Sequence, residues 1–225
     1  MIITKKKDIK EILAALEGKE TVYLFGCNSC AEQCNTGGQK ELDEMAAILA
    51  ENGKKVVGRS LPAETCYRQL TLLDYRKKPE LSGADAVLVL ACGAGVRTVA
   101  DVADETQPVY PALDSLFLAT VERVGRFFEG CSLCGECVLA ETGGICPHTE
   151  CPKGLLNGPC GGMADGMCEV DTENECAWVR IYARLKKQDR LHGMKKIAPP
   201  KDHSVGTKPK KVLLRAPARP ALKKK

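Results

Sequence analysis

The stretch ADAVLVLACGAGVRT, residues 84–98, carries the clearest fold signal in this chain. Its first half is a short, nearly unbroken apolar run, typical of a strand buried on both faces, and a helical pattern follows after the glycines. The same alternation extends in both directions. It predicts strands at 21–27, 54–61, 84–92 and 108–113, and helices at 37–53, 64–78, 95–105 and 114–128. This order predicts an α/β domain over residues 1–125, with a small parallel sheet, Rossmann- or flavodoxin-like, covered by helices on both faces.

The pattern of the first twenty residues bears on the cellular compartment of the protein. Ile9, Ile12, Leu13 and Leu16 recur at helical spacing among alternating Lys and Glu, which predicts an amphipathic surface helix and not a secretory signal. The longest apolar stretch is too short and too rich in glycine to cross a bilayer. We therefore expect a cytoplasmic protein without a membrane partner. In that reducing compartment, thirteen cysteines in 225 residues are better explained as metal ligands or redox thiols than as disulfides.

A second region begins where the periodicity stops, near Gly130. The stretch GGICPHTECPKGLLNGPCGG, residues 143–162, contains almost nothing apolar from which to build a core. Ordering a backbone costs about 1 to 2 kcal/mol per residue, so another source of free energy is needed, and metal–thiolate bonds can supply it. We expect a loop-dominated, cysteine-rich metal-binding domain over residues 126–194. A final amphipathic helix is predicted at 177–191, with an apolar face formed by Trp178, Val179, Tyr182 and Leu185.

The cysteine spacing in this second region indicates the metal. A C-x2-C-x2-C run is how bacterial ferredoxins begin a [4Fe-4S] site, but eight residues rather than three separate Cys137 from Cys146, so a ferredoxin fold is not expected. Zinc is the alternative, because four-cysteine zinc sites also use C-x2-C pairs. Eight cysteines suit two clusters. The candidate ligands are Cys131, Cys134, Cys137, Cys146, Cys151, Cys160, Cys168 and Cys176.

The first domain has five further cysteines, which follow the predicted strands. Because the carboxyl ends of parallel strands share one edge of a sheet, we expect these thiols to converge there. Five sulfurs are enough for one four-cysteine site with one to spare, Cys27 or Cys30, and we take Cys30, Cys34, Cys66 and Cys92 as its ligands. The alternative is that Cys27 and Cys92 are ordinary small buried residues.

Two stretches in the second region resemble a known family. CSLCGECVLAETGGICPHTECPKGLLNGPCGG, residues 131–162, and GMCEVDTENECAWVRIYARL, residues 166–185, are similar to the methylenetetrahydrofolate reductase C-terminal domain family. The chain as a whole resembles the small metal-binding subunit of acetogen-type, two-subunit methylenetetrahydrofolate reductases, specifically over 131–185 and more loosely over 21–118. The tail after Lys195 lies outside this resemblance.

The resemblance implies a non-catalytic, electron-transfer subunit of an oxidoreductase complex. In that family a separate barrel subunit carries a flavin and reduces methylenetetrahydrofolate to methyltetrahydrofolate, in the methyl branch of carbon fixation, the Wood-Ljungdahl pathway. The cysteine-rich subunit is its electron-transfer partner, which here implies two or three [4Fe-4S] clusters, no catalytic residue and no flavin in this chain.

Three alternatives remain open. The first is a zinc-stabilised scaffold that positions the flavin subunit without carrying electrons. The second is a nucleotide-dependent enzyme, because ACGAGVRT follows a strand, although Thr98 replaces the third glycine of the dinucleotide fingerprint. The third is disulfide exchange at Cys27-x2-Cys30.

The tail, residues 195–225, contains eleven Lys or Arg, one acidic residue and five prolines. This composition predicts a mobile basic arm, which is either solvated or docked on an acidic partner such as a further redox protein. Nucleic-acid binding is not expected, since no recognised motif accompanies the charge.

Overall fold

The computed structural model describes residues 1–210 and 212. The chain divides into two compact units, Met1–Gly130 (unit 1) and Cys131–Lys225 (unit 2), and each is described by itself. None of the helices in the described residues combines the length and the apolar character that a membrane span requires.

Unit 1 is built on a four-stranded parallel sheet, which confirms the predicted α/β class. The strand order is β3-β2-β4-β5, and every neighbouring pair is parallel. The carboxyl ends of the strands therefore lie at one edge of the sheet. The strands are β2 (Thr21–Phe25), β3 (Lys55–Ser60), β4 (Ala86–Val89) and β5 (Val109–Pro111).

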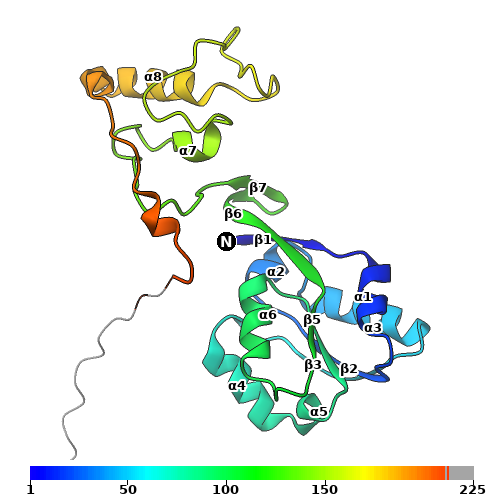
Figure 1. Ribbon diagram of the computed structural model, residues 1–225. Coiled ribbons are helices and arrows are strands. Elements are labelled where there is room, and N and C mark those ends of the chain that lie inside the picture. Colours follow the sequence, from blue (N-terminus) through cyan, green and yellow to red (C-terminus); the bar gives the residue numbers. More distant parts are fainter. Residues whose placement is uncertain (211, 213–225) are drawn as a thin grey trace, which may run out of the picture. The chain divides into compact units, whose positions relative to one another are not determined.

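Helices cover both faces of this sheet (Figure 1). Successive residues of β2 point to opposite faces of the sheet. Leu24 packs with the cluster that contains Leu42, and Phe25 packs with the cluster that contains Val99. All four of these side chains are fully buried. The helices of the first face are α1 (Ile9–Ala15) and α3 (Gln39–Glu51), and those of the second are α4 (Arg68–Lys77), α5 (Pro79–Ser82) and α6 (Gly93–Ala100).

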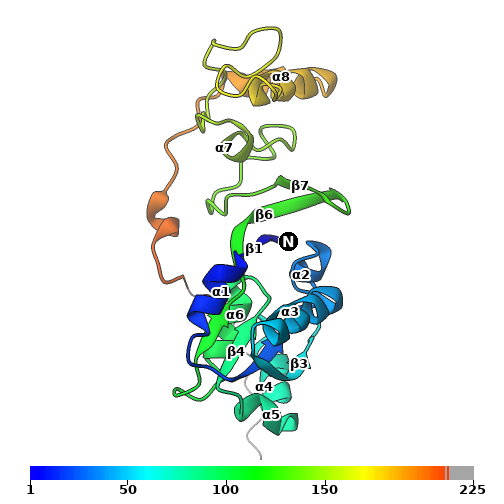
Figure 2. The ribbon, with the colours of Figure 1, turned by 90° about the vertical axis from the view of Figure 1, so that its right-hand side faces the viewer.

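A separate three-stranded antiparallel sheet was not expected from the sequence (Figure 2). Its order is β1-β6-β7, with β1 (Ile2–Lys6), β6 (Leu113–Arg123) and β7 (Arg126–Glu129). The predicted helix at 114–128 is therefore wrong. The prediction of one helix over the first twenty residues is correct only for α1, because residues 2–6 form β1.

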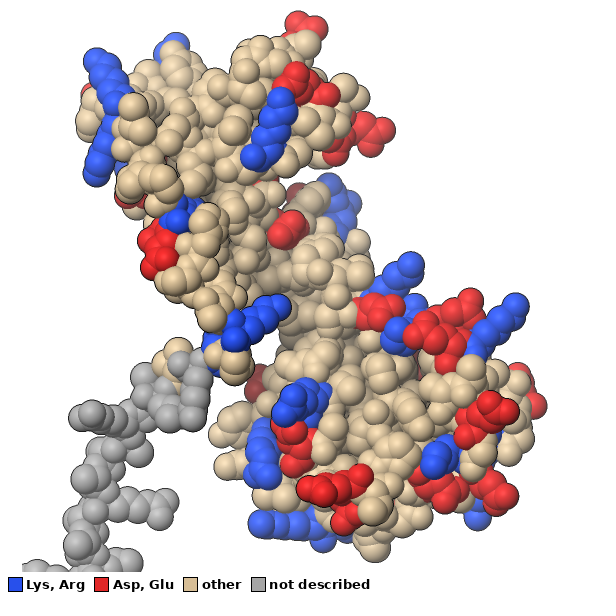
Figure 3. Space-filling model, viewed as in Figure 1, with Lys and Arg blue, Asp and Glu red and all other residues tan. Residues whose placement is uncertain are grey.

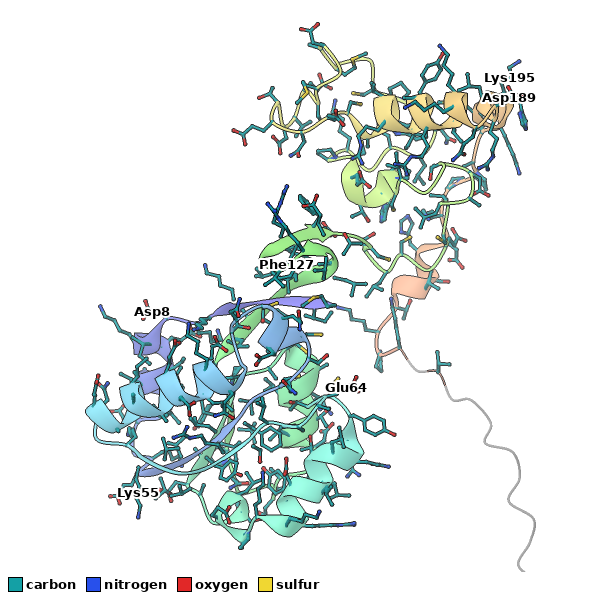
Figure 4. All side chains as sticks on the ribbon, turned by 180° about the vertical axis from the view of Figure 1, so that it is seen from behind. Asp8, Lys55, Glu64, Phe127, Asp189 and Lys195 are labelled. Atoms are coloured by element: carbon teal, nitrogen blue, oxygen red, sulfur yellow. The ribbon has the colours of Figure 1, made fainter. Side chains whose placement is uncertain are left out.

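The physical reason for both errors is strand pairing across the chain. Gly125, with φ of +81°, forms the tight turn between β6 and β7, and the other edge of β6 pairs with β1 more than a hundred residues away. Local periodicity cannot report such a partner. The helix α1 begins only at Ile9, and the preceding Asp8 (Figure 4) caps it with a carboxylate that accepts a hydrogen bond from Lys10 N at 2.8 Å.

The surface of unit 1 mixes the two signs of charge. On the face drawn in Figure 3, basic and acidic side chains are interspersed. Several form ion pairs along helices, including Lys78 with Asp74 at 2.9 Å and Arg97 with Asp101 at 2.8 Å. Exposed pairs of this kind contribute little stability, so the cores on the two faces of the sheet hold the unit together.

The last helix and one residue of the stretch 143–162, which was expected to contribute almost nothing apolar, form a small apolar core in unit 2. Its buried side chains are Ile145, Trp178, Ile181 and Leu185. Of the predicted apolar face of the last helix, Tyr182 is 48% exposed and Val179 is outside the core, whereas Ile181 is fully buried. The helices are α7 (Pro147–Glu150) and α8 (Ala177–Lys187), followed by two 3-10 turns, η1 (Leu191–Lys195) and η2 (His203–Gly206).

The described part of the tail belongs to unit 2, so the prediction of a free arm from residue 195 is wrong there. Asn157 and Ala198 exchange two hydrogen bonds, of 2.7 and 3.1 Å. Lys201 is only 9% exposed. The rest of the predicted arm, residue 211 and residues 213–225, lies outside the described residues.

Candidate metal centres

Four of the eight cysteines of unit 2 line one pocket. They are Cys151, Cys160, Cys168 and Cys176. Leu155, Met163 and Trp178 also line it, together with the charged residues Lys153 and Glu169, and its open volume is about 20 Å³. Zinc and iron–sulfur sites use four thiols as ligands, which makes this pocket a candidate site.

Tight turns bring the last two of these cysteines together. Asp165 and Gly166 both have positive φ, +51° and +83°, and they close a two-residue turn between Ala164 and Met167. Beyond this turn, Cys168 N donates to Asn174 O at 2.9 Å and Cys176 N donates to Gly166 O at 2.8 Å. The backbone thus fixes both cysteines beside the pocket by hydrogen bonds within one hairpin.

Cys160 lies on the exposed side of the pocket, next to an ion pair. Its sulfur lies 3.2 Å from Glu169 Oε1, and Gly162 N donates to the same sulfur at 3.5 Å. Glu169 in turn pairs with Lys153. The hydrogen bond from Lys153, followed by that from Cys160, lowers the pKa of the Glu169 carboxyl, so it is charged at neutral pH.

The C-x2-C-x2-C loop has the backbone shape of a thiolate-binding turn. Leu133 and Gly135 have positive φ, +56° and +88°. Leu133 N points at Cys131 Sγ and donates to it at 3.3 Å. Backbone amides aimed at sulfur stabilise thiolate ligands, which agrees with the predicted role of this loop.

Cys134, the middle cysteine of the loop, has a charged neighbour that the sequence analysis did not anticipate. Lys201 Nζ lies 3.3 Å from Cys134 Sγ. Partial burial raises the pKa of the Cys134 thiol, but a backbone hydrogen bond at Glu136 and the Lys201 ammonium together outweigh it, and the net pKa is below the ordinary value. This thiol is therefore more readily ionised, as a metal ligand must be.

Cys137, which is exposed, is not among the pocket-lining residues, and neither is Cys146. Cys146 precedes Pro147 at the start of α7 and is half-buried. The structure therefore separates one group of four cysteines from the other four, which are Cys131, Cys134, Cys137 and Cys146.

In unit 1 the five cysteines fall into two places. Cys27, Cys66 and Cys92 follow β2, β3 and β4 at the carboxyl edge of the sheet. Cys30 and Cys34 lie instead against β1, where Ile2 N donates to Cys30 Sγ at 3.4 Å and Cys34 Sγ lies 3.9 Å from Ile2 O. The single convergence of five thiols expected from the sequence is thus divided into three and two.

The thiol of Cys66 is influenced by its two neighbours at the sheet edge. Burial raises the pKa of the Cys66 thiol, and the neighbouring Cys92 and Cys27 raise it further. Cys27 and Cys92 are 5% and 8% exposed, which also agrees with the alternative that they are ordinary buried residues.

Within residues 1–210 and 212, no three His, Cys, Asp or Glu side chains are arranged closely enough to hold one metal ion. The chemistry of the donor set, and not a formed coordination sphere, is what fits these cysteines to a metal. Glu169 and Lys201 were not predicted as neighbours of the cysteines. Glu169 could have been suspected because it follows Cys168 directly. No local sequence pattern indicates Lys201, which is 67 residues from the thiol that it contacts.

A family model matches the part of the chain that contains the cysteines of unit 2. A search of curated proteins and a search of solved structures each gave no match. Residues 110–204, somewhat under half of the chain, match the family model described as methylene-tetrahydrofolate reductase C terminal. The match includes all eight cysteines of unit 2 and extends past Lys195, so the expectation that residues 196–204 lie outside the resemblance is wrong. From Tyr110 in β5 to Ser204, this chain is similar to the C-terminal domain of methylene-tetrahydrofolate reductases.

Proposed function

We propose that this protein is the electron-transfer subunit of a methylenetetrahydrofolate reductase complex. The observation that carries the proposal is the pocket lined by Cys151, Cys160, Cys168 and Cys176, because it lies inside the region that matches the reductase family. In this proposal a partner subunit bears the flavin and reduces the folate, and this chain delivers the electrons.

The residues of the pocket suit an electron carrier. A [4Fe-4S] cluster held by these four thiolates would accept and release single electrons. Trp178 and Leu155 line the pocket beside the thiols, and Lys153 and Glu169 line it as well, so apolar and charged side chains would both surround a bound cluster and influence its potential. Cys160 is exposed, so the site is open toward the surface where the cofactor of a partner can approach.

The second group, Cys131, Cys134, Cys137 and Cys146, is proposed to hold a second cluster. The two-residue gaps and the amide that points at Cys131 Sγ support this assignment. In unit 1, the thiols of Cys27, Cys66 and Cys92 are proposed as a further centre, and Cys30 and Cys34 are excluded from it because they lie beside Ile2.

A zinc-stabilised scaffold is the second candidate, and one observation favours it. An open volume of about 20 Å³ has room for one ion, since one water-sized sphere occupies about 10 to 15 Å³ on the same measure. A cuboidal cluster is larger than this volume. In the scaffold the subunit positions its flavin partner, and electrons reach the flavin by another route.

Electron delivery to the flavin separates the two candidates. The chain is co-expressed with a flavin-containing methylenetetrahydrofolate reductase subunit, the complex is purified without oxygen, and a one-electron viologen donor is added in a rapid-mixing instrument. We expect flavin reduction to slow at least tenfold when Cys168→Ser is introduced, with flavin content and subunit ratio unchanged. Equal rates in the two complexes would contradict electron transfer and support the scaffold.

A further inference from the structure

Lys201 is buried against the cysteine loop of unit 2. Its ammonium Nζ lies 3.3 Å from Cys134 Sγ and also donates to the Glu136 carbonyl oxygen. The residue is 9% exposed. A buried ammonium is costly unless an anion compensates it, and neither of these acceptors is a carboxylate. Of the two acceptors of this ammonium, Cys134 Sγ is the one that belongs to a candidate metal ligand.

The segment that carries Lys201 is fixed on both sides of it. Before Lys201, Ala198 exchanges two hydrogen bonds with the Asn157 side chain. After it, Asp202 N donates to Glu136 Oε2 at 3.1 Å. Val205 packs directly on Gly135, where an added Cβ would lie 2.8 Å from the valine side chain. The lysine is thus held over the loop by contacts of its neighbours and not by its own flexible side chain alone.

We infer that Lys201 is a positioning residue of the metal–thiolate centre at Cys131, Cys134 and Cys137, and that it makes reduction of that centre more favourable. The inference rests on the proposed function. Each electron added to a thiolate-bound cluster adds negative charge, and a fixed ammonium next to one ligand stabilises that charge. A hydrogen bond to a ligand sulfur acts in the same direction.

The test compares three variants of the full chain, purified without oxygen. Lys201→Met removes the charge and keeps the length of the side chain, and Lys201→Arg keeps the charge. Lys195→Met is the control, because Lys195 is an exposed residue beyond the end of α8 (Figure 4). The midpoint potential of each cluster is measured by redox titration with electron paramagnetic resonance, and Trp178 fluorescence checks that unit 2 is folded.

We expect Lys201→Met to lower the equilibrium constant for one-electron reduction of one cluster about tenfold. This corresponds to a midpoint potential about 59 mV lower. The potential of the second cluster should be unchanged, and so should all potentials of the Lys195→Met protein. In Lys201→Arg, the potential of the affected cluster should stay close to the wild-type value. A folded Lys201→Met protein whose potentials all equal those of the wild type overturns the inference.

Failure of the proposed function gives a different result. If the wild-type chain contains zinc and no iron, the electron-transfer proposal is wrong, and the role of Lys201 is then measured as the rate of zinc release to a chelator. Faster release from Lys201→Met than from Lys195→Met supports the positioning role. Equal release rates overturn it.

Discussion

The indole nitrogen of Trp178 donates a hydrogen bond to the carbonyl oxygen of Leu155 at 3.0 Å. This contact joins the first turn of α8 to the loop between Cys151 and Cys160, and both side chains also line the four-cysteine pocket. The helix and the cysteine loop are therefore one structural unit. The small core beneath them adds to the free energy that metal–thiolate bonds were expected to supply.

Truncation of Trp178 tests this coupling. Trp178→Phe leaves the Leu155 carbonyl without its donor and should destabilise the protein by about 1 to 2 kcal/mol, whereas Trp178→Ala also opens a cavity and should cost about 3 to 5 kcal/mol. Tyr182→Ala is the control on the same helix, because this side chain is 48% exposed. The midpoint of urea unfolding, followed by circular dichroism, is the measurement. If Tyr182→Ala destabilises as much as Trp178→Ala, the coupling is wrong.

The turn at Gly166 should control metal retention. Its φ is +83°, and an added Cβ would touch nothing within 4 Å, so Gly166→Ala acts through the backbone alone, at a cost of about 1 to 2 kcal/mol. The strain falls on the hairpin that fixes Cys168 and Cys176. We expect less metal per chain in Gly166→Ala than in wild type, measured by elemental analysis.

Gly193→Ala is the matched control for this turn. Its added Cβ also meets nothing within 4 Å, and its φ is not in the left-handed region. Metal content should stay at the wild-type value. A loss of metal from both variants would show that the effect is not specific to the hairpin.

The sequence predicted the parallel sheet and proposed the cysteines as ligands, but it did not show how the cysteines are grouped in the fold. Strands such as β4 can be predicted because their own residues form a continuous apolar run, which indicates a buried strand. The strand β6 depends on pairing with β1 at the far end of the unit, and no local pattern reports that partner. The grouping of Cys168 with Cys151 depends likewise on a hairpin and on the packing of Trp178, which only the folded chain reveals.

Double substitutions test the grouping of the cysteines in unit 2. If Cys151 and Cys168 share one centre, Cys151→Ser/Cys168→Ser should lose no more metal than Cys168→Ser alone. By contrast, Cys131→Ser/Cys168→Ser should lose the metal of two centres. Metal per folded chain is measured by elemental analysis. The opposite order, with the larger loss in the first pair, would refute the division into two groups.

Asp85 should give unit 1 a distinct dependence on pH. Its carboxylate accepts from Thr21 N and Thr21 Oγ1, both at 2.8 Å, and these hydrogen bonds, backbone first, lower its pKa below the ordinary 3.8. A lowered pKa means that the stabilisation is complete above about pH 3.8 and is lost as the pH falls through the folded-state value.

The Asp85→Ala variant measures this contribution. Its loss of stability relative to wild type, from urea unfolding, should be constant from pH 5 to 7 and should shrink below about pH 3.8. Asp101→Ala, which removes an exposed helical ion pair with Arg97, is the comparison and should have a small effect. A difference between wild type and Asp85→Ala that grows as the pH falls would contradict the assignment.

The content of iron, acid-labile sulfide and zinc per chain, on protein purified without oxygen, tests the central claim most directly. Two clusters in unit 2 predict about eight irons and eight sulfides, and a third centre at the sheet edge raises the iron to about twelve. The protein should then be brown. A colourless protein with one or two zinc ions and no iron would contradict electron transfer and leave the cysteine-rich unit as a structural module.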